Sequence, residues 1–307
     1  YAEANVNIGI SLLNMGDLGA AMKYFKQALK INPEYVEAYR NMGVALQANG
    51  DLSEAIEVYK KVININPDYV EAYINMGVAL QNKGHMHAAM DSFKKAIQIK
   101  PDHVGAYNNM GISLKDLGQL NAAIDCFNQA IKIEPDYADA YWNQSLALLS
   151  KGDFKNGWSK YEWRWKESSC DIPLVLTKKP RWDSLKAERI LLWPEQGIGD
   201  IIMFASMINE IHQKSKHLII QVDERLIPLF SRSFPEDIIY YPENVKVPET
   251  DYDSHIPFGS LPSHFRPNVE SYKRASGNYL KAEKAYSDAL RENLKAESGD
   301  YIVGLTW

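Results

Sequence analysis

Two consecutive stretches decide the fold of the N-terminal half: YVEAYRNMGVALQANGDLSEAIEVYKKVININP at residues 35–67 and YVEAYINMGVALQNKGHMHAAMDSFKKAIQIKP at residues 69–101. Both carry an Asn-Met-Gly tripeptide, a later glycine, an aromatic residue and a closing proline in the same register. The register recurs every 34 residues, with the first glycine at Gly9, Gly43, Gly77 and Gly111 and with Ser145 in a fifth copy. A period of this length is typical of helical repeats that stack into a solenoid.

One unit shows how the repeat is built. The apolar pattern predicts helices at about 38–48 and 52–63, and the pair Gly50-Asp51 between them supplies a C-cap and then an N-cap. Pro67 ends the second helix because proline cannot continue one. A single helix pair cannot bury its own apolar face, so the copies must stack on one another.

The period and the glycine, alanine, aromatic and proline positions resemble the tetratricopeptide repeat over residues 1–170, as five units of which the last is modified. In this family the first helix of each unit lines a concave groove, which implies a bound protein or peptide partner. A side-chain amide both donates and accepts hydrogen bonds, so a row of asparagines can pair with a peptide backbone. The repeats of protein O-GlcNAc transferases, which these repeats resemble, carry such a ladder; family consensus alone is the alternative explanation. The ladder expected here is Asn7, Asn41, Asn75, Asn109 and Asn143.

Composition excludes several classes of protein. The 307 residues carry a formal net charge of −5, with 46% hydrophobic and 24% charged residues, which suits two globular domains and rules out a disordered chain. A mildly acidic balance argues against nucleic acid as the main partner. The longest apolar run, at 201–208, is too short to span a bilayer, and the start has no signal-peptide pattern, so we expect a cytoplasmic protein. Cys126 and Cys170 are too few to frame a disulfide scaffold.

Six of the seven tryptophans lie between residues 142 and 193. Trp158, Tyr161 and Trp165 share one face of a predicted helix. Large aromatic side chains of this kind pack domains together or offer a stacking platform for carbohydrate, and we expect packing between domains here. Residues 171–189, which contain two prolines, are predicted to be the linker.

From residue 190 onward, short apolar strands alternate with helices. The pattern predicts strands at 190–193, 217–222, 238–241 and 253–258, with helices at about 201–214 and 224–232. This alternation favours a parallel, doubly wound sheet, whose ligands bind beyond the carboxyl ends of the strands. The turn Gly197-Ile198-Gly199-Asp200 follows the first strand. A dinucleotide fingerprint is disfavoured because Ile202 stands where its third glycine would be.

The string LLWPEQGIGDIIMFA at residues 191–205 resembles the first strand, loop and helix of the heptosyltransferase-like glycosyltransferases. The stretches at 158–165 and 253–262 are also similar to proteins that join tetratricopeptide repeats to such a domain. The resemblance implies a GT-B fold of two Rossmann-like halves, with residues 190–298 as the acceptor-binding half and 299–307 as the start of the second half. That second half binds the nucleotide-sugar donor, so we expect no cofactor on this chain and no sugar transfer by it alone.

In that family the aspartate after the glycine is the catalytic base, and it maps onto Asp200. A carboxylate there removes the proton of the acceptor hydroxyl as its oxygen attacks the anomeric carbon, which gives inversion without a metal ion. The other role open to Asp200 is an N-cap of the following helix. The resemblance further implies acceptor or loop contacts at Gln196, Gly197, Gly199, His255 and Ser260.

The sequence therefore predicts an α-solenoid of five tetratricopeptide repeats followed by an α/β Rossmann-like domain, the N-terminal half of a GT-B fold. The predicted function is a repeat-guided glycosyltransferase whose solenoid binds a protein or peptide acceptor. The alternative is a non-catalytic interaction adaptor with an idle Rossmann-like platform. Because Tyr1 lies in phase with Tyr35, we also expect further repeats upstream.

Overall fold

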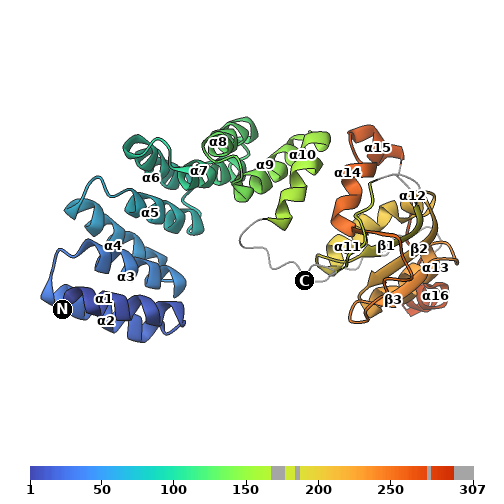
Figure 1. Cartoon of the computed structure of the whole chain (residues 1–307), viewed down its shortest axis with the longest axis horizontal. Helices are drawn as coiled ribbons and strands as arrows, with labels where there is room; N and C mark the ends of the chain where they lie inside the picture. The colour runs from blue at the N-terminus through green and yellow to red at the C-terminus, as the bar shows by residue number, and fades with distance from the viewer. Residues whose placement is uncertain (167–176, 184–186, 275–277, 294–307) are drawn as a thin grey trace. The chain divides into compact units, whose positions relative to one another are not determined.

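The computed structural model describes residues 1–166, 177–183, 187–274 and 278–293. It divides into two compact units, Tyr1–Ser168 and Ser169–Trp307, which we call the repeat unit and the α/β unit (Figure 1). Each unit has its own core of buried apolar side chains. The start of a second half expected at 299–307, and residues 171–176 and 184–186 of the expected linker, lie outside the described residues.

The repeat unit consists of helix pairs stacked in chain order along a curve, blue to green in Figure 1. The pairs are α1 (Ala2–Asn14) and α2 (Leu18–Ile31), α3 (Val36–Ala48) and α4 (Leu52–Ile65), α5 (Val70–Asn82) and α6 (Met86–Ile99), α7 (Val104–Asp116) and α8 (Leu120–Ile133), and α9 (Ala138–Lys151) and α10 (Phe154–Tyr161), followed by the 3-10 helix η1 (Glu162–Trp165). The prediction of two helices per 34-residue unit is confirmed.

Two glycines per repeat explain why the pairs fold alike. A Cβ atom built on the first glycine would lie 2.4–2.6 Å from an aromatic ring of the second helix, in the pairs Gly9–Phe25, Gly43–Tyr59, Gly77–Phe93 and Gly111–Phe127. The second glycine has a φ of +73° to +87°, a left-handed conformation that glycine adopts without a steric penalty, at Gly16, Gly50, Gly84, Gly118 and Gly152. The first glycine thus permits close packing, and the second ends the first helix.

The odd-numbered helices form the inner side of the curved repeat unit. Each of them contacts its own partner helix and also the next odd-numbered helix along the stack. Helices on the inside of a curve approach each other more closely than those on the outside, so α1, α3, α5, α7 and α9 line the concave face. We call this concave surface the inner face.

The α/β unit is built on a four-stranded parallel sheet with the order β3-β2-β1-β4. The strands are β1 (Ala187–Trp193), β2 (Ser215–Val222), β3 (Ile239–Pro242) and β4 (Ser254–Pro257). Leu191 of β1 lies opposite Ile219 of β2 on one side and His255 of β4 on the other. The four predicted strands are confirmed to within a few residues, and residues 190–193 of β1 are buried as the core of a central parallel strand should be.

Short helices connect and follow these strands. They are α11 (Ile198–Phe204), η2 (Ala205–Met207) and α12 (Ile208–His212) after β1, η3 (Glu224–Leu226) and α13 (Ile227–Ser233) after β2, and η4 (Phe258–Ser260), α14 (Leu261–Phe265), α15 (Val269–Arg274) and α16 (Lys284–Asn293) after β4. Among the described residues, no helix combines the length and the apolar character needed to cross a bilayer.

The prediction of one continuous helix at about 201–214 was wrong, because η2 interrupts it. The carbonyl of Ile202 accepts a hydrogen bond from the Tyr279 hydroxyl at 3.0 Å, and that of Ser206 accepts one from Arg266 Nη2 at 3.5 Å. Side chains that engage backbone carbonyls in this way interrupt the helical hydrogen-bond ladder.

Part of the segment that we expected to be linker instead extends the sheet. Trp182 N donates to the His255 carbonyl at 2.9 Å, and His255 N donates to the Pro180 carbonyl at 3.1 Å. The Trp182 ring is buried and lies against His264 and Phe265. Residues 180–182 therefore lie along the free edge of β4.

The other described tryptophans also pack within their own units. Trp163 stacks on Tyr141 with ring centroids 3.9 Å apart, and Trp142 and Trp158 both contact Tyr161. These contacts close the last helix pair of the repeat unit.

Candidate functional site

The inner face carries the predicted asparagine ladder, but its amides are not equivalent. Asn41 is 5% exposed; its Nδ2 donates to the Glu37 carbonyl at 2.8 Å, and its Oδ1 accepts from Arg40 Nη2 at 3.1 Å. Asn143 Nδ2 donates to Asn108 Oδ1 at 3.1 Å. These two members of the ladder already have partners within the repeat unit.

The other three members keep their amides available. Asn7 is exposed, whereas Asn75 and Asn109 are partly buried on α5 and α7. Within the described part of the chain, none of the three side chains makes a hydrogen bond. The centre of the inner face therefore offers two neighbouring amides, one repeat apart, whose donors and acceptors are open to a ligand.

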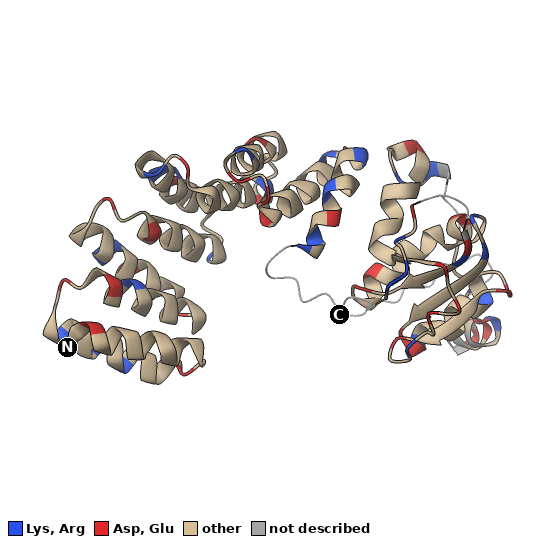
Figure 2. Cartoon of the chain, viewed as in Figure 1, with Lys and Arg blue, Asp and Glu red and all other residues tan. Residues whose placement is uncertain are grey.

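Charges do not gather into a basic surface. Figure 2 shows lysine and arginine interspersed with aspartate and glutamate over the described residues of both units. Four of the odd-numbered helices have an acidic residue in the first turn, namely Glu3, Glu37, Glu71 and Asp139. This distribution suits the favourable interaction of carboxylates with helix N-termini and does not suit a phosphate backbone as partner.

A second site lies in the α/β unit, at the carboxyl ends of β1 and β4. The strand order reverses at β1, since β2 and β3 extend to one side and β4 to the other. Ligands of open parallel sheets bind at such a switch point. We call this region the switch-point edge, formed by residues 194–200 after β1 and 258–260 after β4.

Buried polar contacts hold the switch-point edge together. Glu195, 7% exposed, accepts a hydrogen bond from Gly259 N through Oε1 at 2.7 Å and so ties the two loops to each other. Ser260, 2% exposed, accepts one from Arg181 Nη2 at 2.7 Å. The sequence alone did not single out Glu195 and Arg181, because only the pairing of distant segments reveals their partners.

His255 lies on β4 beside this edge. Its Nδ1 accepts a hydrogen bond from Trp193 Nε1 at 3.0 Å. Burial, and secondarily the positive charge of Arg181, lower the pKa of His255 below its usual value of 6.5. The imidazole is therefore neutral at pH 7, and its acceptor nitrogen is already occupied.

Asp200 lies in the first turn of α11 and is exposed. The N-cap is Gly197, and Asp200 N donates to the Gly197 carbonyl at 3.0 Å, so the alternative of Asp200 as N-cap is wrong. Within the described part of the chain, its carboxylate makes no hydrogen bond or ion pair.

Gly197 and Gly199 have no evident structural reason to be glycine. A Cβ atom on Gly197 would meet only Asp200 Oδ2 at 4.0 Å, and one on Gly199 would meet nothing within 4 Å. Gly197 has a φ of −65°, which any residue adopts. In the repeat unit, by contrast, each first glycine faces a ring. Without a Cβ atom at these two positions, the backbone can be approached closely by a ligand.

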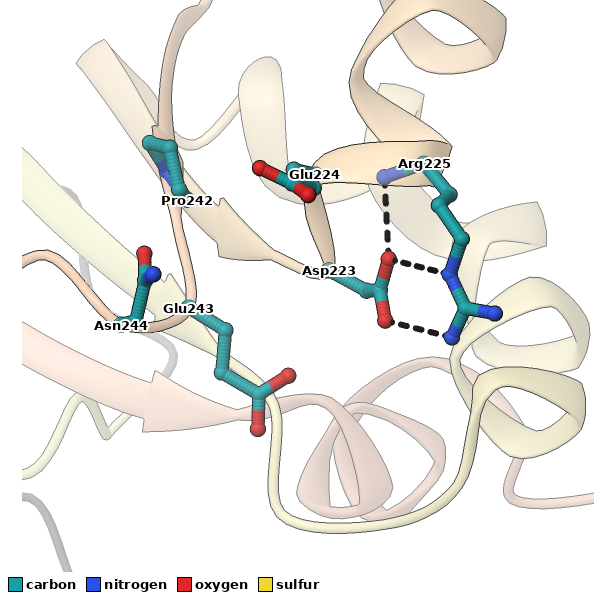
Figure 3. Close-up of a pocket in the computed structure, with 6 residues that line it drawn as sticks. All are labelled: Asp223, Glu224, Arg225, Pro242, Glu243 and Asn244. Atoms are coloured by element: carbon teal, nitrogen blue, oxygen red, sulfur yellow. Dashed lines mark hydrogen bonds and ion pairs between the residues drawn. The ribbon is translucent and has the colours of Figure 1, made fainter.

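A cleft lies at the same edge of the sheet, at the ends of β2 and β3, and we did not expect it from the sequence. It has a volume of about 590 Å³. Figure 3 shows the Asp223–Arg225 pair on one side and Glu243 on the other. It is lined by Asp223, Glu224, Arg225, Pro242, Glu243 and Asn244.

Comparison with known proteins identifies the repeats. A model of the TPR repeat matches residues 9–50, 45–84 and 113–152, and two models of the tetratricopeptide repeat match residues 70–103 and 92–125. Residues 9–152 are therefore tetratricopeptide repeats, as predicted.

Individual relatives and solved structures each match about half of the chain. The chain is 32% identical to protein FlbA of Caulobacter vibrioides over 176 residues, which cover 52% of the chain and 29% of FlbA, so it spans less than a third of that relative. PilF of Pseudomonas aeruginosa has a similar fold, with a TM-score of 0.51 at 17% identity over 55% of this chain and 77% of PilF. MamA aligns with a TM-score of 0.47 at 28% identity, over 57% of this chain and 97% of MamA.

Proposed function

We propose that the repeat unit binds an extended polypeptide segment along its inner face. The observation that carries this proposal is the pair of unengaged amides, Asn75 and Asn109, on adjacent inner helices. Each amide can donate to one main-chain carbonyl and accept from one main-chain N–H. An extended segment presents such groups whatever its side chains are, so binding would tolerate many sequences.

The test begins with peptides selected on the purified chain from a displayed library of random sequences. The double variant Asn75→Ala/Asn109→Ala is expected to weaken the selected peptides about tenfold or more, since each lost hydrogen bond costs about 1 kcal/mol. The matched control is Asn64→Ala/Asn121→Ala, which removes two exposed amides from α4 and α8 on the other side of the stack. Equal losses in both variants would refute binding at the inner face.

A second proposal concerns the α/β unit: that it is the acceptor half of an inverting glycosyltransferase, with Asp200 as the base. The resemblance of residues 191–205 motivates it. Its structural support is the loop at the switch-point edge, where Gly197 and Gly199 leave room for a ligand next to the exposed Asp200 carboxylate. Such a base takes the hydroxyl proton while the anomeric carbon is attacked.

The proposed glycosyl transfer needs groups from this chain and from a nucleotide-sugar donor. The nucleotide sugar supplies the anomeric carbon and its leaving group. Asp200 orients the acceptor hydroxyl and takes its proton, while Glu195 acts as a positioning residue that fixes the loop before Asp200 through Gly259. His255, neutral and engaged with Trp193, is a weaker candidate for acceptor contact than its place in the sequence indicated.

The intact gene product that contains residues 1–307 allows a direct test. It is incubated with the selected peptide and a panel of nucleotide sugars, and the peptide mass is followed. We expect a mass increase of one glycosyl residue, reduced at least about a hundredfold by Asp200→Asn. Asp288→Asn, an exposed aspartate on α16, is the control. Peptide binding without transfer would favour the alternative, an adaptor whose α/β unit is an idle platform.

A further inference from the structure

Each odd-numbered helix contributes one stripe of side chains to the inner face. Residues three, four or seven positions apart lie on the same side of a helix. In α5 the stripe through Asn75 therefore contains Glu71, Val78 and Asn82, all of which are exposed or partly buried. Gly77, by contrast, faces a ring of the partner helix α6. We call each such set of four residues an inner stripe.

The inner stripes align into rows across the repeat unit. The first row is acidic in four of the five repeats, the second is the asparagine ladder, and the third is aliphatic in all five. The acidic row consists of Glu3, Glu37, Glu71 and Asp139, with Gly105 in the fourth repeat. The aliphatic row consists of Ile10, Val44, Val78, Ile112 and Leu146, all partly buried. A ligand that lies over the asparagines therefore has carboxylates on one side and aliphatic side chains on the other.

The helix dipole alone does not account for the acidic row, because it favours a carboxylate near the N-terminus of any helix. The even-numbered helices α2, α4 and α10 have an aspartate at the N-cap, and only α4 among the even-numbered helices has an acidic residue in its first turn. The odd-numbered helices have tyrosine or histidine at the N-cap, and four of them carry the carboxylate on the second helical residue. That position belongs to the inner stripe.

The inner stripes do not neutralise this negative charge themselves. None of their positions holds lysine or arginine. Glu71 makes no hydrogen bond or ion pair within the described part of the chain, and Glu37 accepts a hydrogen bond from the uncharged Tyr35 hydroxyl at 3.2 Å. The neighbouring Arg40 donates to Asn41 and not to a carboxylate. The acidic row is therefore available to attract positive charge on a ligand.

The geometry of an extended chain determines how its side chains meet these rows. In a strand, the N–H and C=O groups point at right angles to the side chains, and successive side chains point to opposite sides. A segment whose main chain pairs with Asn75 and Asn109 therefore directs its side chains sideways along the inner face. They point alternately toward the acidic row and toward the aliphatic row.

We propose that the inner face selects extended segments in which basic and aliphatic residues alternate. The proposal rests on the proposed binding of a polypeptide at the asparagines. The amides hold the main chain of any sequence, whereas the acidic row and the aliphatic row select among side chains. Complementary charge of this kind also accelerates association and is screened by salt.

The probe is a fluorescein-labelled nonapeptide of alternating lysine and valine, with lysine at both ends. At about 3.3 Å per residue it spans about three repeats whose inner helices lie about 10 Å apart. One comparison peptide has glutamate in place of every lysine, and another has serine in place of every valine. Fluorescence anisotropy with the full chain is expected to show binding of the probe and at least about tenfold weaker binding of either comparison peptide.

Variants of the acidic row locate the effect. Glu37→Gln/Glu71→Gln is expected to weaken the probe at least about fivefold. The matched control, Glu54→Gln/Asp125→Asn, removes two exposed carboxylates from α4 and α8 and is expected to leave binding unchanged. The charge-reversed variant Glu37→Lys/Glu71→Lys is expected to bind the glutamate peptide more tightly than the lysine probe. Circular dichroism checks that each variant is folded.

The outcomes separate this proposal from the one on which it rests. Weakening by Glu37→Gln/Glu71→Gln without weakening by the control supports the selection of basic segments. A probe that is weakened by Asn75→Ala/Asn109→Ala but not by Glu37→Gln/Glu71→Gln overturns the selection and leaves polypeptide binding standing. Equal affinity for the lysine and glutamate peptides, or no binding of the probe while library-selected peptides still bind, overturns it in the same way. Selected peptides that are insensitive to the asparagines overturn both proposals.

Discussion

At the scale of single residues, the repeat is defined by one contact between a glycine and a ring. The Cβ position of Gly77 lies 2.4 Å from Phe93 Cε1, so an alanine there must displace the ring or separate the helices. The fifth repeat differs at this contact: Ser145 carries a Cβ atom, and Tyr161, at the position of the ring in the other repeats, contacts Trp142 and Trp158. Trp142 and Trp158 therefore pack against the ring in the repeat where serine replaces the first glycine.

Gly77→Ala is expected to destabilise the repeat unit by about 1–3 kcal/mol, the usual cost of overpacking. The measurement is urea unfolding followed by circular dichroism. Gly19→Ala is the control, because a Cβ there meets only Asp17 Oδ1 at 3.9 Å and alanine favours a helix over glycine. A Gly77→Ala variant as stable as the wild type would show that the ring contact does not constrain this position.

The third repeat lacks the tyrosine hydroxyl that, in the second repeat, hydrogen-bonds to the side-chain amide of a glutamine. The Tyr59 hydroxyl donates to Gln47 Oε1, whereas Phe93 stands at the position equivalent to Tyr59, and the buried Nε2 of the equivalent Gln81 has no hydrogen-bond partner among the described residues. A hydroxyl at position 93 could accept a hydrogen bond from this Nε2. Phe93→Tyr is expected to stabilise the repeat unit by about 0.5–1.5 kcal/mol, and Tyr59→Phe to destabilise it by a similar amount. Unfolding midpoints that move in the same direction in both variants would contradict this account.

The Asp223–Arg225 pair makes a prediction about pH. Hydrogen bonds from the Arg225 side chain, and secondarily from its backbone N–H, lower the pKa of Asp223 from 3.8 to about 2. Because the pKa is lower in the folded state, the pair stabilises the fold above about pH 4, and this contribution is lost as the pH falls toward 2. Carboxyl-carbon NMR should give a midpoint near 2, which Arg225→Gln should raise toward 3.8. An unchanged midpoint in that variant would refute the assignment of the shift to Arg225.

At the scale of elements, sequence periodicity predicts individual helices and strands, but it does not predict contacts between segments that are distant in sequence. The 34-residue register placed every helix pair of the repeats, and apolar runs located all four strands. The interruption of the helix at 201–214 depends on Tyr279 and Arg266, which are distant in sequence. The extension of the sheet by residues 180–182 depends on pairing with β4. Neither contact leaves a periodic signal.

Arg266 stabilises the interrupted helix at 201–214 through Glu210. Removing the Glu210 carboxylate should therefore lower the stability of the α/β unit measurably. The Arg266 side chain is 3% exposed and pairs with Glu210, at 2.6 Å for Nη2–Oε1 and 2.9 Å for Nη1–Oε2. Glu210→Gln is expected to destabilise the α/β unit by about 1–3 kcal/mol, because a buried guanidinium loses a charged acceptor. Glu270→Gln, which breaks the exposed pair with Lys273, should change stability by less than about 0.5 kcal/mol. Equal effects in chemical denaturation would contradict the assigned role of Arg266.

In the candidate sites, too, the sequence predicts local features but not contacts between distant residues. The sequence placed Asp200 and the two glycines directly after the first strand, although helix α11 already begins at Ile198 and includes Gly199 and Asp200. It also located the asparagines on the first helix of each unit. It could not show that Asn41 and Asn143 are engaged, since their partners are set by helix packing. Glu195 gave no signal either, because its hydrogen bond to Gly259 spans two loops.

At the scale of the whole molecule, a solenoid of tetratricopeptide repeats and a parallel α/β unit occur in one chain. We propose that the inner face of the repeat unit binds an extended polypeptide. Hydrogen–deuterium exchange of the full chain, with and without a selected peptide, tests it most directly. We predict slower exchange in peptic fragments from α3, α5 and α7, and unchanged exchange in fragments from α4, α6 and α8. Protection of the even-numbered helices, or of neither set, would contradict the claim.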